Sequence, residues 1–186
     1  MDRIAVVFPG GQFGPYTALL TFAAEAAELR GARILPHMWT RPDEPPTLAL
    51  DERMAWVTGE ANPVLDRIAT ESPGATPLVI AKSLGTCVIR EAAERGLPGV
   101  WLTPLFNQPE VVAEFRRAKA PMLLIGGTAD HSWNGELARE LSPHVLEIPD
   151  ADHGLFVPGR LAASAEVLGR VATAVEDFLD TVIWPS

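Results

Sequence analysis

The chain has very little cysteine and no cluster of basic residues. Its 186 residues include one cysteine, Cys87, which excludes an intrachain disulfide framework and any metal site built from several cysteines. Lysine and arginine total 15 against 24 aspartates and glutamates, which gives a formal net charge of −9. Because nucleic acids and anionic membranes are recognised through basic patches, we expect neither as a partner.

Long apolar runs are also missing. No stretch approaches the roughly 18 apolar residues needed to span a bilayer. The N-terminal Met1-Asp2-Arg3 lacks the charge pattern of a signal peptide. We therefore expect a soluble, cytoplasmic protein. A composition of 47% hydrophobic and 21% charged residues predicts one globular domain over residues 1–186.

Short apolar segments alternate with segments of helical periodicity. Short, continuously apolar segments are typical of parallel strands that are covered on both faces. The expected strands are Ile4–Phe8, Arg33–Trp39, Pro77–Ala81, Val100–Thr103, Pro121–Ile125 and Val145–Ile148. The expected helices are Pro15–Arg30, Leu50–Glu71, Leu84–Arg95, Pro109–Ala118, Gly135–Leu141 and Leu161–Val182. This alternation predicts a three-layer α/β/α sandwich around a parallel sheet with right-handed crossovers.

Two local features qualify this pattern. Asn62-Pro63 is typical of an N-cap followed by proline at the first helical position, so the second helical region is expected to break near Gly59. The proline-rich segment Arg41–Pro46 is the one conspicuous loop. It leaves the C-terminal edge of the second strand, and it is the one segment that could fold over the active site. The connection between the fourth and fifth strands has room for one helix and no cap domain, which predicts a shallow, open site.

Ser83 lies on a predicted strand-to-helix turn, within Ala81-Lys82-Ser83-Leu84-Gly85. Small residues two before and two after a serine let it sit on a sharp turn with its hydroxyl lifted clear of the sheet, where it can act as a nucleophile. Ala81 stands where a glycine is usual. The competing interpretation is a serine that simply caps the helix.

An acid and a histidine follow two later strands. Asp130 comes after Met122–Ile125 and His153 after Val145–Ile148, and parallel strands end at the same edge of a sheet. The order serine, acid, histidine is similar to that of the α/β-hydrolase family, in a small lidless form, over nearly the whole chain. The resemblance implies the strand order 2-1-3-4-5-6 without the usual antiparallel leading pair.

The resemblance assigns Ser83 as nucleophile, His153 as base and Asp130 as the acid that orients the imidazole. His131 and His144 are competitors for the base, but His144 precedes a strand and so belongs to the wrong edge, and His131 adjoins the acid. His37 is expected to be structural or to line a pocket. Asp150 and Asp152 lie on the same short loop as the histidine and are expected to be exposed or to cap turns.

The glycine-rich loop after the first strand, Pro9–Gly14, completes the expected site. The resemblance places one oxyanion-hole N–H in this loop, at Gly11 with Gln12 as the alternative, and the second at Leu84. A phosphate-cradling loop is the competing interpretation, but the spacing is not that of a dinucleotide-binding motif. Aromatic residues after strand ends could wall a substrate pocket or pack in the core. The candidate substrate-binding residues are Gln12, Phe13, Trp39, Phe106 and Trp133.

Two neighbours of Ser83 complete the set of expectations. Lys82 is expected to point away from the site, and Cys87 to be an inert core thiol.

Together, the triad and the glycine-rich loop predict a serine hydrolase that cleaves a small ester or thioester, with a small molecule as its partner and without a metal or organic cofactor. Its oligomeric state is left open. A catalytically silent binding protein of the same fold, or a nucleotide binder, is the alternative.

Overall fold

The computed structural model describes residues 2–40 and 49–185, so the predicted loop Arg41–Pro46 lies outside the described residues. The described residues form a six-stranded sheet. The strands are β1 (Ile4–Phe8), β2 (Arg33–Pro36), β3 (Leu78–Lys82), β4 (Gly99–Leu102), β5 (Met122–Gly127) and β6 (His144–Ile148). The helices are α1 (Ala18–Glu28), α2 (Leu50–Glu71), α3 (Ile89–Arg95), α4 (Pro109–Arg117), α5 (Gly135–Leu141) and α6 (Leu161–Phe178).

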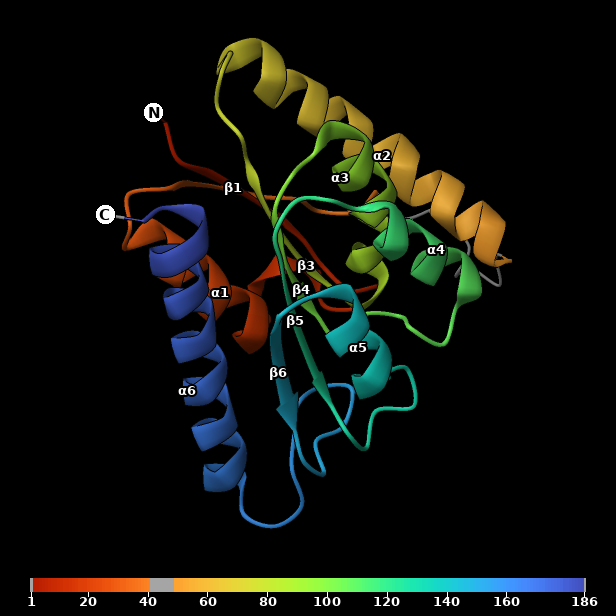
Figure 1. Cartoon of the computed structure of the whole chain (residues 1–186), viewed down its shortest axis with the longest axis vertical. Helices are drawn as coiled ribbons and strands as arrows, with labels where there is room; N and C mark the ends of the chain where they lie inside the picture. Colours follow the sequence, from red (N-terminus) through yellow and green to blue (C-terminus); the bar gives the residue numbers. More distant parts are fainter. Residues whose placement is uncertain (1, 41–48, 186) are drawn as a thin grey trace.

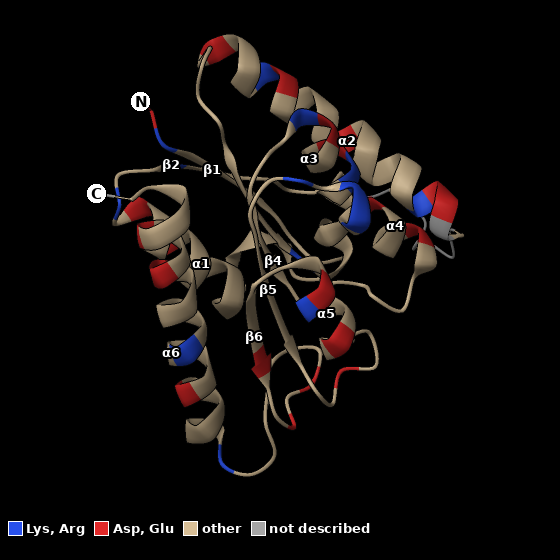
Figure 2. Cartoon of the chain, viewed as in Figure 1, with Lys and Arg blue, Asp and Glu red and all other residues tan. Residues whose placement is uncertain are grey.

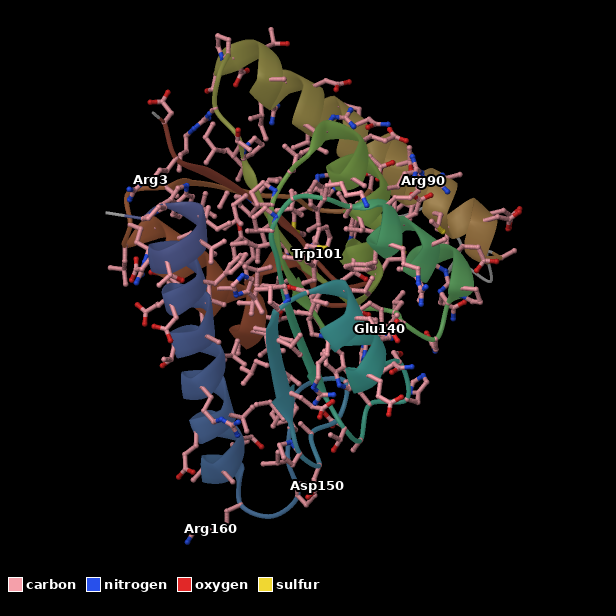
Figure 3. The ribbon with its side chains drawn as sticks, in the orientation of Figure 1. Arg3, Arg90, Trp101, Glu140, Asp150 and Arg160 are labelled. Carbon is pink, nitrogen blue, oxygen red and sulfur yellow. The ribbon has the colours of Figure 1, made fainter. Side chains whose placement is uncertain are left out.

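The strand order is β2-β1-β3-β4-β5-β6, and every neighbouring pair is parallel. The predicted order and fold class are therefore confirmed. All strands end at one edge of the sheet, which collects the loops after β1, β3, β5 and β6. In Figure 3, Trp101 of β4 lies in the middle of the molecule, whereas Asp150 lies in the loop beyond the end of β6.

Helices cover both faces of the sheet (Figure 1). One face, which includes Val7, Ile80 and Ile125, packs against α1 and α6. The other face, which includes Val6, Ala81 and Leu124, packs against α2, α3 and α4, with α5 beside them. Side chains alternate between the two faces along each strand, so a strand that is apolar throughout contributes to both cores.

The second helical region is one helix, contrary to the predicted break. α2 runs without interruption from Leu50 to Glu71 with Pro63 inside it. Asn62 does not cap a helix; its side chain accepts a hydrogen bond from Arg95 at 2.8 Å. Met54, Val57, Ala61, Leu65 and Ile68 are buried against the sheet. This continuous apolar stripe holds the helix together, although proline removes one helical hydrogen bond, and that loss is commonly worth about 3 kcal/mol.

Smaller differences occur at the ends of elements. β2 ends at Pro36, short of the predicted Trp39. The segment after β3 begins as a 3-10 helix over Ser83–Val88 before α3 starts, and another 3-10 turn, Gly14–Tyr16, precedes α1. α6 continues into a π-helical turn, Leu179–Ile183. Within the described ranges, no helix is long and apolar enough to cross a membrane.

Candidate active site

Ser83 occupies a strained turn at the end of β3. Its φ angle is +53°, in the left-handed region that a residue with a side chain adopts at a cost of about 1 kcal/mol or more. The turn also requires Gly85, because a Cβ there would lie 2.3 Å from the carbonyl oxygen of Phe8. On the other side, Ala81 is fully buried in the core. The small neighbours therefore permit the close packing that the sequence pattern predicts.

The structure brings Ser83, His153 and Asp130 together in a hydrogen-bonded line. Ser83 Oγ lies 2.8 Å from His153 Nε2, and His153 Nδ1 lies 2.7 Å from Asp130 Oδ2. A carboxylate only accepts hydrogen bonds, so Nδ1–H donates to Asp130. Nε2 then carries the lone pair and accepts from the Ser83 hydroxyl. This tautomer leaves the histidine ready to take the serine proton.

The acid is the most enclosed member of the line. The Asp130 side chain is 0% exposed, whereas that of His153 is 34% exposed. Burial by itself raises the pKa of Asp130, but hydrogen bonds from His153 and from the Ser132 N–H, with the neighbouring imidazoles, outweigh it and hold that pKa below its usual value. Asp130 is therefore an anion across the neutral range, and it stabilises positive charge on the His153 ring.

Close contact between two loops fixes the positions of the acid and the histidine. A Cβ on Gly127 would lie 2.2 Å from the carbonyl oxygen of Ala151. The backbone N–H of Ala129 donates to the same carbonyl at 3.0 Å. The backbones of the loop after β5 and the loop after β6 are therefore in direct contact. This packing sets the distance between Asp130 and His153.

The competing residues lie elsewhere or have other partners. His144 is at the start of β6, at the opposite edge, where its ring packs against Phe178. The side chain of His131 is 85% exposed. His37 packs against Trp39, with ring centroids 4.6 Å apart. Asp152 caps a turn, because its Oδ1 accepts hydrogen bonds from the N–H groups of residues 154 and 156; this agrees with the prediction.

A cavity of about 460 Å³ opens beside Ser83. The predicted residues Gly11, Gln12, Phe13 and Leu84 all line it, together with His153. Phe13 is 79% exposed and lies at the rim. A Cβ on Gly11 would lie 3.5 Å from the Leu84 side chain, so the glycine loop and the residue after Ser83 are in contact. Gly11 and Leu84, the residues predicted to supply the oxyanion donors, therefore line the same cavity as Ser83.

The other predicted substrate residues are not brought to this cavity. Trp39 lines a neighbouring hollow of about 260 Å³ that shares the glycine loop, and its Nε1–H donates to the Pro9 carbonyl at 2.9 Å. Phe106 and Trp133 pack together in the core, with ring centroids 5.6 Å apart, and Trp133 donates to Glu147. Leu105, the residue before Phe106, lines the cavity instead.

The prediction that Lys82 points away from the site is wrong. Lys82 lines the cavity, and its Nζ donates to the backbone carbonyl of His153 at 3.1 Å. Side chains alternate along β3, so Lys82 shares the face of Ile80, and the loop after β6 passes over this face where the strand ends. Burial lowers the pKa of Lys82, while Asp130 and Asp152 act in the opposite direction.

Arg53 of α2 also lines the cavity, and sequence reasoning missed it. Nothing in the sequence around Arg53 connects it to Ser83, because the contact exists only through the packing of α2 on the sheet. Lys82 carried a usable signal, since it precedes the nucleophile directly.

The described part of the chain has no arrangement typical of a metal centre. Among the residues that the structure describes, no group of three or more histidine, cysteine or acidic side chains could hold a metal ion. Cys87 is 2% exposed, and burial raises the pKa of its thiol to about 12. It is the inert core thiol that the sequence predicts.

Comparison with known proteins identifies solved structures that have the same fold. No family model matches the chain, and no curated protein is significantly similar to it. Among solved structures, Est1E from Butyrivibrio proteoclasticus superposes with a TM-score of 0.74 at 14% identity, covering 96% of this chain and 87% of that one. XC6422 from Xanthomonas campestris, described as an α/β serine hydrolase without lid, gives 0.69 at 15% identity, covering 95% and 82%.

A dienelactone hydrolase from Anabaena variabilis is also similar, with a TM-score of 0.64 at 18% identity, covering 96% of this chain and 86% of that one. Est1E has also been solved with ferulic acid bound. At these identities the likeness is one of fold. The chain has the fold of the small lidless α/β serine hydrolases.

Proposed function

We propose that the protein is a serine hydrolase that cleaves a small ester or thioester through an acyl-enzyme. The observation that carries this proposal is the line of two hydrogen bonds, 2.8 Å and 2.7 Å long, that joins Ser83, His153 and Asp130 beside an open cavity. A serine hydroxyl needs a base within such a distance to become nucleophilic, and the base needs a partner that fixes its tautomer.

In the first half of the reaction, Ser83 Oγ attacks the carbonyl carbon of the substrate as its proton passes to His153 Nε2. The oxyanion that forms accepts hydrogen bonds from the backbone N–H groups of Leu84 and of Gly11, or of Gln12 as the alternative. Each such donor contributes roughly 3–4 kcal/mol in a site without water. His153 then gives the proton to the departing alkoxide or thiolate, and the acyl group stays on Ser83.

In the second half, water replaces the alcohol. His153 Nε2 takes a proton from the water as its oxygen attacks the acyl carbon, and then returns the proton to Ser83 Oγ as the acid leaves. Asp130 remains an anion throughout and balances the charge on the imidazolium. Its low pKa supports this role.

The openness of the site supports a small substrate. One helix, α4, connects β4 and β5, and the cavity beside Ser83 is open to solvent. Two structural neighbours point to the same class: one is a dienelactone hydrolase, and Est1E binds ferulic acid. We extend to this chain only the class they share, which is small carboxylic esters and their acids.

Labelling with a fluorophosphonate tests the proposal. The reagent should label the wild type once, at Ser83, and should fail to label Ser83→Ala, which should also lose ester turnover. Ser72→Ala, at the C-terminal end of α2 and away from the cavity, is the matched control and should keep both labelling and hydrolysis of 4-nitrophenyl acetate. The stability of Ser83→Ala should lie within about 1 kcal/mol of the wild type, because the substitution removes one hydroxyl from a turn.

Absence of labelling and of ester turnover in a wild-type protein that is folded would overturn the proposal. That result would favour the silent binding protein of the same fold. Labelling at a serine other than Ser83 would also reject the assignment of the nucleophile.

A further inference from the structure

The Lys82 side chain links the strand that leads to the nucleophile with the loop that carries the base. Lys82 directly precedes Ser83 and is the last residue of β3, where its backbone pairs with Leu102 of β4. Its Nζ donates a hydrogen bond to the backbone carbonyl of His153 at 3.1 Å. Lys82 and His153 are 71 positions apart in the chain, so this bond joins two segments that only the fold brings together.

From this contact we infer that Lys82 is a positioning residue: its ammonium holds the backbone of His153 so that the imidazole stays within reach of Ser83 Oγ. The inference rests on the proposed function, because it concerns the base of the same reaction. In this role Lys82 acts through His153 and needs no contact with the substrate.

The anchors of the histidine loop explain why one further hydrogen bond matters. Before His153, the fully buried Ala151 packs on Gly127, and after it Leu155 is buried. His153 lies between these anchors, and its side chain is partly exposed. Among the residues that the structure describes, Lys82 is the only one that hydrogen-bonds to the backbone of His153. Loss of this bond therefore frees the backbone that carries the base.

The charges around Lys82 favour an ammonium at this position. Figure 2 shows acidic residues on the loops that follow β5 and β6, at the edge of the sheet where β3 ends. Two of them, Asp130 and Asp152, attract the Lys82 ammonium. Asp152 also shapes the histidine loop, because its Oδ1 accepts hydrogen bonds from the N–H groups of residues 154 and 156. Lys82 is therefore attracted to the loop that it binds.

The dependence of the triad on distance gives the expected size of the effect. Ser83 Oγ and His153 Nε2 are 2.8 Å apart, and a misplacement of about 1 Å costs on the order of a hundredfold in rate. Without the Lys82 hydrogen bond, we expect the imidazole to spend part of its time out of reach of the serine. The rate at which Ser83 reacts should then fall by roughly tenfold to a hundredfold.

A double-mutant cycle with His153 tests the inference. Lys82→Met places an unbranched apolar group of similar length there, and it should slow fluorophosphonate labelling of Ser83 by roughly tenfold to a hundredfold. In a His153→Ala background the same substitution should change the labelling rate by less than about twofold, because no imidazole is left to position. Mass spectrometry of the intact protein measures both rates. Lys119→Met, the same replacement at an exposed lysine, is the matched control and should be labelled at the wild-type rate.

Restoring a donor at position 82 separates the hydrogen bond from the charge. Lys82→Cys can be alkylated with 2-bromoethylamine, 2-iodoethanol or 1-iodopropane, which give side chains of equal length that end in an ammonium, a hydroxyl or a methyl group. The ammonium and the hydroxyl can donate to the His153 carbonyl and should each raise the labelling rate severalfold, whereas the methyl group should not. Treated wild-type protein is the control for reaction elsewhere, and its one cysteine, Cys87, is buried.

Three results would overturn the inference while the proposed hydrolase stands. The first is labelling of Lys82→Met at the wild-type rate. The second is a loss that persists in the His153→Ala background, which would assign Lys82 to substrate binding or to the fold in general. The third is recovery with the ammonium alone, which would assign the effect to charge and not to the hydrogen bond.

Hydrogen exchange tests the same contact without any reaction, so its outcome is independent of the proposed function. Should the wild type neither be labelled nor hydrolyse esters, the proposed function fails. The peptide that contains residues 152–157 should still exchange its amide hydrogens severalfold faster in Lys82→Met than in the wild type or in Lys119→Met. Equal exchange in the three proteins would show that Lys82 does not hold the loop, and would overturn the inference.

Discussion

The backbones of Gly85, two residues after Ser83, and of Phe8, the last residue of β1, are in contact. A Cβ on Gly85 would lie 2.3 Å from the carbonyl oxygen of Phe8 and 2.8 Å from that of Pro9. The turn that carries Ser83 therefore packs directly on the end of β1, where the glycine loop begins. This contact sets the distance between the nucleophile and the loop that we propose to supply an oxyanion donor.

Replacing Gly85 by alanine should damage both stability and activity. The new methyl group meets backbone atoms that cannot rotate away, so β1 and the Ser83 turn must separate, at a cost of about 3 kcal/mol in the free energy of unfolding. The residual folded protein should hydrolyse esters poorly. Urea unfolding and ester kinetics measure the two effects.

Gly169→Ala is the control for this substitution. Gly169 is an exposed residue of α6, and a Cβ there would have nothing within 4 Å, so alanine should stabilise the protein by about 0.5–1 kcal/mol through helix propensity. If Gly85→Ala were as stable and active as Gly169→Ala, the close approach of the turn to β1 would be disproved.

The low pKa of Asp130 predicts how the triad contributes to stability at acid pH. The pKa in the folded state lies below its ordinary value of 3.8, so the stabilising contribution is fully present above pH 3.8 and is lost as the pH falls through the folded value. We expect the wild type to exceed Asp130→Asn in stability at pH 5 and this difference to shrink below pH 3.8. Urea unfolding at pH 5, 4 and 3.5 measures it. A difference that grows on acidification over this range would contradict the direction of the shift.

Cys87 should be unreactive in the native state. Burial raises the pKa of its thiol to about 12, so at pH 8 only about one molecule in ten thousand carries the reactive thiolate. Ellman's reagent should detect no thiol in the folded protein over minutes and one thiol in 6 M guanidinium chloride. Rapid reaction of the native protein would show that the segment after Ser83 opens readily.

Short acyl chains should be the preferred substrates. The cavity of about 460 Å³ is open to solvent, and its apolar lining consists of a few side chains such as Leu84 and Leu105. Each added methylene contributes at most about 0.8 kcal/mol, and only where it is fully buried. In a series of 4-nitrophenyl esters kept below their micelle concentrations, kcat/KM should peak at roughly two to six carbons. A steady rise to twelve carbons would reveal an acyl tunnel that the described residues do not form.

The sequence alone determined the layered fold and the order of the three residues now found in one hydrogen-bonded line. Apolar segments such as Val79–Ala81 and Leu123–Ile125 are short and uninterrupted because parallel strands are buried on both faces, and this property is visible residue by residue. Parallel strands end at one edge, so the position of Asp130 and His153 after their strands was sufficient to predict that they meet Ser83.

Only the tertiary structure decided which helix residues contribute to the cavity beside that line. Arg53 lines the cavity only through the packing of α2 on the sheet, and it lies 30 residues before Ser83 in the chain, so no local pattern connects the two residues. The helix around Pro63 also depends on tertiary packing. α2 continues through this proline because the burial of five side chains against the sheet stabilises the helix by more than one proline destabilises it. The helix preference of a single residue is worth about 1–3 kcal/mol in the free energy of folding. The burial of apolar side chains adds up over a whole helix face, and this contribution exists only once the helix packs on the sheet.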